Sequence, residues 1–150
     1  MKKAEKPHVL MAFACESVGA DPKAPFSFEN VVDGIGAPDF PAPTGRWFAV
    51  FCFFSDVTRT IENCRVVVQD PGGQIVGHLA VKDLRFTTDN PTSRNVVGMQ
   101  GFAWPYPGRF LIKFVAGESD ELALFPILVQ HVPAADETEE TEETEEPERS

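Results

Sequence analysis

Short apolar runs recur along the whole chain, and Gly, Pro, Asn and Asp separate them. This pattern is typical of many short strands in a sandwich or barrel. It predicts strands at 9–17, 26–32, 46–54, 64–69, 74–79, 85–87, 95–102, 110–116 and 122–131. No window combines helical apolar spacing with capping residues, and the nearest helix candidate is a single turn within 56–63, which is rich in β-branched and polar residues.

Two hairpins have the clearest sequence signals. The first turns at Asp70–Gly73 (Asp-Pro-Gly-Gly), where proline presets one dihedral angle and the glycines accept positive φ. The second joins the last two predicted strands through the polar turn Gly117–Asp120. Because Pro126 interrupts the final strand, we expect an edge position or a bulge there.

Three of the predicted strands are apolar on both faces. Trp47–Phe54 is apolar at every position, and Val9–Cys15 and Ala123–Val129 have the same character, whereas a simple sandwich strand alternates apolar and polar residues. Two explanations are open. Either loops or the N-terminal segment cover the outer face, or that face is a protein interface, since a patch of large apolar side chains seldom stays exposed on a monomer.

The candidate interface residues are large aromatic side chains, which dominate the energetics of many interfaces. They are Phe48, Phe51, Phe53, Phe54, Trp104, Tyr106 and Phe125. Trp104–Gly108 is also interpreted as a packed turn that starts the next strand, so its aromatic residues become anchors for a partner if they are exposed. Strand addition at the Leu122–His131 edge is a second route to association.

Composition sets the number of domains and the character of the surface. A chain of 150 residues with 43% hydrophobic content is long enough for one core and too short for two average domains. The formal net charge is −10, and residues 136–149 hold nine acids and one base, so this stretch contributes −9 + 1 = −8. The remaining −2 is a poor match for nucleic acid or membrane phosphates, so neither partner is expected.

The acidic stretch also defines the predicted boundaries. We expect a flexible N-terminus at 1–7, a β-sandwich domain at 8–132 and a disordered acidic tail at 133–150, because the tail has no large apolar residue to offset the entropy of ordering. The tail is interpreted either as a solubilising segment or as an element that offers its carboxylates to a basic partner.

No motif in the chain indicates catalysis, a cofactor or a metal. There is no nucleophile elbow, and Cys15, Cys52 and Cys64 lie in or beside apolar stretches, where cysteine behaves as a small hydrophobe. His8, His78 and His131 lie far apart without metal-ligand spacing, and the loop aspartates do not form a calcium motif. The glycines of 32–38 lead into an extended Pro-rich crossover without the helix that a phosphate site needs. We therefore expect a protein that is not an enzyme.

The expected location is the cytoplasm. The three cysteines show no close pairing and no secretory segment precedes them, which indicates reduced thiols. No apolar run approaches the length that a membrane-spanning helix requires, so a membrane role is not expected.

The chain resembles a bacterial family of small cytoplasmic proteins described as a domain of unknown function. The resemblance covers Val9 to Val132, and it is carried by Ala12–Glu16, Phe28–Ile35 with the crossover after it, Asp70–Gly73, and a closing hairpin from Pro107–Phe110 to Phe125–Ile127. The family commonly has Tyr where Phe110 stands. The closing hairpin is also similar to immunoglobulin-like sandwiches in general. The resemblance implies an all-β fold, an immunoglobulin-like antiparallel sandwich of about seven to nine strands.

These observations predict a non-catalytic module for protein interaction or self-association, with a protein partner or a second copy of the chain. The alternative is a small-ligand binding or sensing domain with a pocket at one end of the sandwich, near Trp104 and Tyr106.

Overall fold

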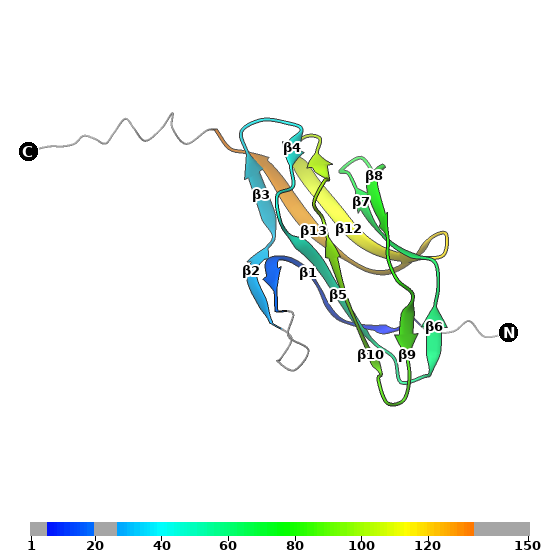
Figure 1. Ribbon diagram of the computed structural model, residues 1–150. Helices are drawn as coiled ribbons and strands as arrows, with labels where there is room; N and C mark the ends of the chain where they lie inside the picture. Colours follow the sequence, from blue (N-terminus) through cyan, green and yellow to red (C-terminus); the bar gives the residue numbers. More distant parts are fainter. Residues whose placement is uncertain (1–5, 20–26, 134–150) are drawn as a thin grey trace, which may run out of the picture.

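The computed structural model describes residues 6–19 and 27–133, and every regular element within these ranges is a strand (Figure 1). The four-stranded sheet has the order β10 (Thr92–Gly98), β5 (Phe48–Phe54), β1 (His8–Val18) and β2 (Phe28–Val32). The five-stranded sheet has the order β3 (Gly34–Ala37), β13 (Asp120–His131), β12 (Gly108–Ala116), β7 (Cys64–Gln69) and β8 (Ile75–Ala80). Two small ribbons pair β4 (Ala42–Pro43) with β11 (Ala103–Trp104), and β6 (Arg59–Ile61) with β9 (Leu84–Phe86).

The core lies between the two larger sheets, which confirms the predicted all-β sandwich. Phe51 and Phe53 of β5 meet Phe114 of β12 edge-on, with ring centroids 5.3 and 5.1 Å apart, and Phe51 lies 5.5 Å from Phe125 of β13. Phe51, Phe53 and Phe114 have no exposed surface. Alternation along each strand delivers these rings to one layer, where edge-to-face contacts add to the stabilisation from burial.

The chain passes from one sheet to the other between β2 and β3. β2 ends the four-stranded sheet, and only Asp33 separates it from β3, which pairs in parallel with β13. Sequence analysis placed a turn and crossover at this position and missed β3. A Cβ at Gly36 would lie 2.7 Å from a methyl group of Val132, so glycine allows the close approach of these two segments. Because glycine is not typical of strands, the sequence of this segment does not predict one.

Both predicted hairpins are confirmed. Asp70–Gly73 joins β7 to β8, with Gly73 at a φ of 92° and its N–H donating to the Asp70 carbonyl over 3.0 Å. In the second hairpin, β12 pairs with β13 from Gly108 to Ala116.

Pro126 lies at an edge of β13, as predicted. The Leu128 N–H donates to the Asp33 carbonyl at the start of β3, and Pro126, two residues earlier, directs its nitrogen to the same side, where β3 does not extend. The bulge in this hairpin lies elsewhere, between Phe114 and Val115. The edge available for strand addition is therefore shorter than the predicted Leu122–His131, because β3 already pairs with Leu128–His131.

Two local predictions are wrong. The suggested helical turn within 56–63 is instead strand β6, which pairs with β9. β10 begins at Thr92 and ends at Gly98, because the turn that follows places Met99 in the core. The final strand has apolar side chains on both faces, as its sequence indicates, but its outer face is not covered, since Leu124 and Leu128 are 45% and 44% exposed while Phe125 and Ile127 are buried.

Some predictions concern residues outside the described ranges. These are most of the N-terminal segment, the start of the strand predicted from Phe26, and the acidic stretch 134–150. Among the described residues, no helix of the length and apolar character needed to cross a membrane is present.

Candidate functional site

Four of the predicted interface residues belong to the core. Phe51, Phe53 and Trp104 have no exposed surface, and Phe125 is 7% exposed. These side chains fill the space between the sheets and present no surface to a partner. The other three differ: Phe48 and Phe54 are half-buried at the ends of β5, and Tyr106 is exposed.

Trp104 packs within a cluster of aromatic rings at one end of the sandwich. Its ring stacks on Trp47 with centroids 6.0 Å apart and planes within 6° of parallel, and it meets Phe102 and Phe110 edge-on. The indole N–H groups of both tryptophans are buried and have no hydrogen-bond acceptor among the described residues. Trp104 is therefore packed, as the packed-turn interpretation expects, but it belongs to β11 and the bend lies after it, at Tyr106 and Pro107.

Tyr106 has a structural partner. Its hydroxyl donates to Asp70 Oδ2, while Asp70 Oδ1 accepts the Gln74 N–H over 2.8 Å. The hydrogen bond from Tyr106, followed by the backbone hydrogen bond from Gln74, lowers the pKa of Asp70 below its ordinary value, and the same contact with Asp70 raises the pKa of Tyr106. The pair ties the β7–β8 hairpin to the segment before β12.

We expect Tyr106→Phe to reduce stability in a way that depends on pH. Because the pKa of Asp70 is lower in the folded chain than its ordinary 3.8, its ionised form stabilises the fold above that pH, and this stabilisation is lost as pH falls through the folded-state pKa. The melting-temperature difference between the parent protein and the variant should be largest near neutral pH and shrink at about pH 2. Thermal melts across this range check it, and an equal difference at both ends would contradict it.

The outer face of the four-stranded sheet is dry at its centre. Val50 and Cys52 of β5 and Cys15 of β1 have no exposed surface, and Met11 and Phe13 are among the partly buried residues packed against them. Phe28 of β2 meets Phe13 edge-on at 4.7 Å. The chain itself therefore excludes water from both faces of β5, and the described side chains that pack on the outer face come from β1 and β2 of the same sheet, not from the loops or N-terminal segment of the first explanation.

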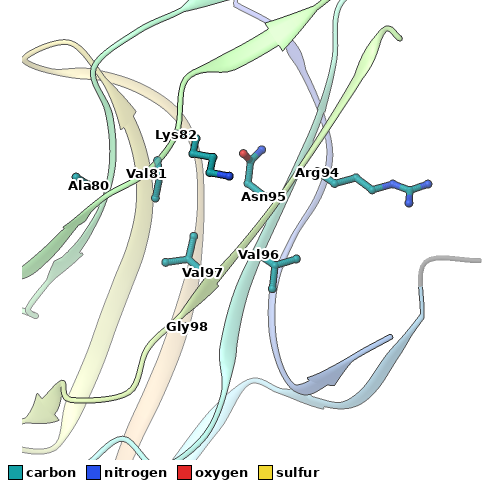
Figure 2. Close-up of a pocket in the computed structure, with 8 residues that line it drawn as sticks. All are labelled: Ala80, Val81, Lys82, Arg94, Asn95, Val96, Val97 and Gly98. Carbon is teal, nitrogen blue, oxygen red and sulfur yellow. The ribbon is translucent and has the colours of Figure 1, made fainter. Parts of the chain in front are cut away.

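A groove follows the opposite side of the sandwich from the β2–β3 crossing. There the edge strand β10 of one sheet faces the edge strand β8 of the other, and three adjoining hollows of about 220, 580 and 610 Å³ run between them. We call this the edge groove. Its central hollow is lined by Ala80–Lys82 on one side and Arg94–Gly98 on the other (Figure 2).

One end of the edge groove is apolar. The smallest hollow lies among Val66, Val68, Leu79, Met99 and Phe102, with Gln100 and His78 at its margin. Leu79 is 38% exposed although it lies on β8 opposite the buried Val66, because β8 extends the five-stranded sheet beyond its cover. Apolar side chains of a ligand could be buried here.

The other end of the edge groove is polar and basic. It is lined by Lys82, Arg85 and Arg94 together with one acid, Asp83, and the polar residues of the β10 N-terminus. The side chains of Lys82 and Arg85 have no hydrogen bond or ion pair within the part of the chain that the structure describes. By contrast, Lys113 pairs with Glu121 over 2.6 Å, and Arg65 donates to the carbonyls of Gly117 and Glu118.

The two faces of β10 present different side chains at the groove. Figure 2 shows Asn95 and Val97 directed toward Lys82 and Val81, whereas Arg94 and Val96 leave the strand on its opposite face. A ligand lying along this edge would therefore meet a basic side chain on each face, Lys82 on one and Arg94 on the other.

The backbone of β10 is unpaired by any described strand on its groove side. Met99 N–H donates to Trp47 O over 3.0 Å, and Pro91 O accepts from Ser55 N–H over 2.9 Å, so odd-numbered residues direct their backbone polar groups toward β5. The alternation of a strand then directs those of Val96 and Gly98 into the groove. An edge of this kind is a template for an added strand.

No other chemistry is assembled among the described residues. Cys15, Cys52 and Cys64 are free and buried, and desolvation raises the pKa of each thiol. No group of three or more potential metal-ligating side chains occurs within 6–19 and 27–133.

No protein-family model matches the chain, and no curated protein matches it.

Sequence reasoning missed the edge groove. Lys82 and Arg85 were not singled out, because the strands on either side of the groove belong to different sheets and nothing in their local pattern shows that they face each other. The signal that could have found it is the density of bases in 82–94, which holds three within a nearly neutral domain.

Proposed function

We propose that this protein is a non-catalytic interaction module that binds an extended polypeptide segment in the edge groove, by addition of a strand to β10. The observation that carries the proposal is the juxtaposition of an unpaired strand edge with a groove that is apolar at one end and basic at the other. Main-chain hydrogen bonds to the edge supply affinity in this mode of recognition, and the flanking hollows supply specificity.

A small-ligand domain is the second candidate. The alternative predicted a pocket near Trp104 and Tyr106, but neither residue lines any of the three hollows of the edge groove. The apolar hollow of about 220 Å³ favours this candidate only in part, because it continues into a long open groove, and small-molecule sites enclose most of the ligand surface.

Several finer features belong to the same proposal. We infer an immunoglobulin-like arrangement from the two packed sheets, together with membership of the bacterial family that the sequence resembles. The unpaired cysteines support a reducing location such as the cytoplasm.

The test is selection of peptides from a random phage-displayed library on the full chain, followed by amide chemical-shift mapping. We expect binders whose shifts fall on 80–82 and 94–98. Val96→Pro removes a groove-facing N–H without removing a bond to β5, so it should weaken binding by at least about tenfold and leave the fold intact. Val96→Thr keeps the N–H and is the matched control, with binding expected to be unchanged.

Three results would reject the proposal. They are failure to select any binder, shifts that map to another face, and equal binding by Val96→Pro and Val96→Thr. Both Val96 variants must have the melting temperature of the parent protein. Ser93→Pro would remove a backbone hydrogen bond to β5, so it is expected to lower the melting temperature.

A further inference from the structure

The ligand that the edge groove best fits is strongly acidic and extended, and the chain contains such a segment. Residues 136–149 carry a net charge of −9 + 1 = −8, whereas three bases and one acid line the polar end of the groove. We propose that the acidic segment of one copy of the chain docks in the edge groove of a second copy. This inference rests on the function proposed above and names its partner.

The pattern of the acidic segment matches the two faces of β10. Glutamates occur as adjacent pairs at 139–140, 142–143 and 145–146, with threonine between the pairs. In an extended chain successive side chains point to opposite sides, so each pair directs one carboxylate to each face. Lys82 lies on one face of the β10 edge and Arg94 on the other, so one pair at a time can meet a base on both sides.

The strand register favours docking of the acidic segment between two copies of the chain. Docking within one chain is less favourable, for the following reason. Ala80 pairs with Arg65, Arg65 with Val115, and Val115 with Glu121, so the basic end of the groove is level with Glu121. β13 continues ten residues further to His131, on the side of the sandwich away from β6 and β9 (Figure 1). The separation is about 33 Å along the strands and about 14 Å across three strand spacings.

Crossing that separation would use most of the acidic segment. A path of about 36 Å takes about eleven extended residues, which reaches position 142 and consumes five of the nine acids. In a second copy no part of the acidic segment is needed to cross this distance, so any of the nine carboxylates can be placed at the groove. The contact joins two different surfaces, which makes the association heterologous and dependent on concentration.

The test titrates a synthetic peptide of residues 134–150 into the isotope-labelled full chain at low ionic strength. We expect amide shifts at 80–85 and 92–98, and affinity at least about tenfold weaker at about 300 mM salt than at about 50 mM, because screening weakens exposed charge pairs. Arg85→Glu should weaken binding by about tenfold or more. Arg109→Glu, an exposed base on β12, is the matched control and should bind the peptide normally.

Sedimentation velocity of the full chain completes the test. We expect the mean mass to rise with protein concentration at low salt, and Arg85→Glu to remain monomeric while Arg109→Glu associates. A peptide with glutamine at every glutamate position should not bind.

The outcomes separate the two proposals. If library-selected peptides bind the edge groove and the 134–150 peptide does not, the acidic partner is rejected and the binding function stands. If neither binds, both are rejected. A monomeric full chain whose 80–85 and 92–98 amides already have the shifts of the bound state would show that the segment occupies its own groove, which overturns the intermolecular docking.

Discussion

Phe114→Ala is expected to lower the free energy of unfolding by about 3 to 5 kcal/mol, the usual cost of removing a fully buried phenylalanine. Phe114 contacts both Phe51 and Phe53 across the two sheets and has no exposed surface. Since small domains are stable by only about 5 to 15 kcal/mol, this loss brings the chain close to unfolding. Urea unfolding monitored by circular dichroism measures it.

Two variants make this prediction decisive. Phe114→Leu keeps most of the volume and should cost less than Phe114→Ala, so it provides a measurable value if the alanine variant does not fold. Val31→Ala removes an apolar side chain that is 67% exposed on β2 and should change stability by less than about 0.5 kcal/mol. A Phe114→Ala protein with the parent's urea midpoint would show that these rings are not the core.

Gly108→Ala is expected to destabilise the fold by about 1 to 3 kcal/mol. Gly108 begins β12 with a φ of 150°, which L side chains rarely adopt, and a Cβ there would lie 2.5 Å from the ring of Pro71. The alanine must therefore displace the hairpin turn that Tyr106 and Asp70 hold in place. Thermal or urea unfolding measures the loss.

Gly72→Ala, in the Asp70–Gly73 turn that Gly108 approaches, is the matched control. Its Cβ would meet nothing closer than Asp70 Oδ1 at 3.5 Å, an ordinary contact. Both substitutions restrict the unfolded chain similarly, so their difference isolates the strain in the folded state. Equal stability of the two variants would contradict the close approach of Gly108 to Pro71.

The elements that sequence analysis found are those whose cause is local. β7, the Asp70–Gly73 turn and the start of β8 combine β-branched residues with a proline-glycine turn, and the structure reproduces this hairpin almost residue for residue. The buried character of both faces of β5 could also be predicted, because a run without polar residues allows no other placement in water.

The elements that sequence analysis missed depend on partners distant in the chain. β3 contains two glycines and forms because it lies beside β13, and β6 forms because β9 pairs with it. Neither segment has a strand pattern of its own. Their existence follows from the tertiary structure.

The candidate site shows the same division. Aromatic residues were correctly expected to matter, but the sequence could not show which face of a strand each ring occupies, so core rings such as Phe51 were taken for interface residues. The edge groove arises from two strand edges that belong to different sheets. Lys82 and Asn95 face each other there only because the sandwich is open on that side.

The two sheets are linked differently at their two borders, because β2 of one sheet leads into β3 of the other through Asp33 alone. At one border the chain connects the two sheets directly, since β2 pairs with β1 in one sheet and β3 pairs with β13 in the other. At the other border β8 and β10 lie opposite each other and do not pair. We expect the two sheets to separate most easily along the border formed by β8 and β10. Amide hydrogen exchange should therefore be faster in these strands than in β2 and β3. A binding peptide could thus widen the edge groove while the connection between β2 and β3 keeps the two sheets together.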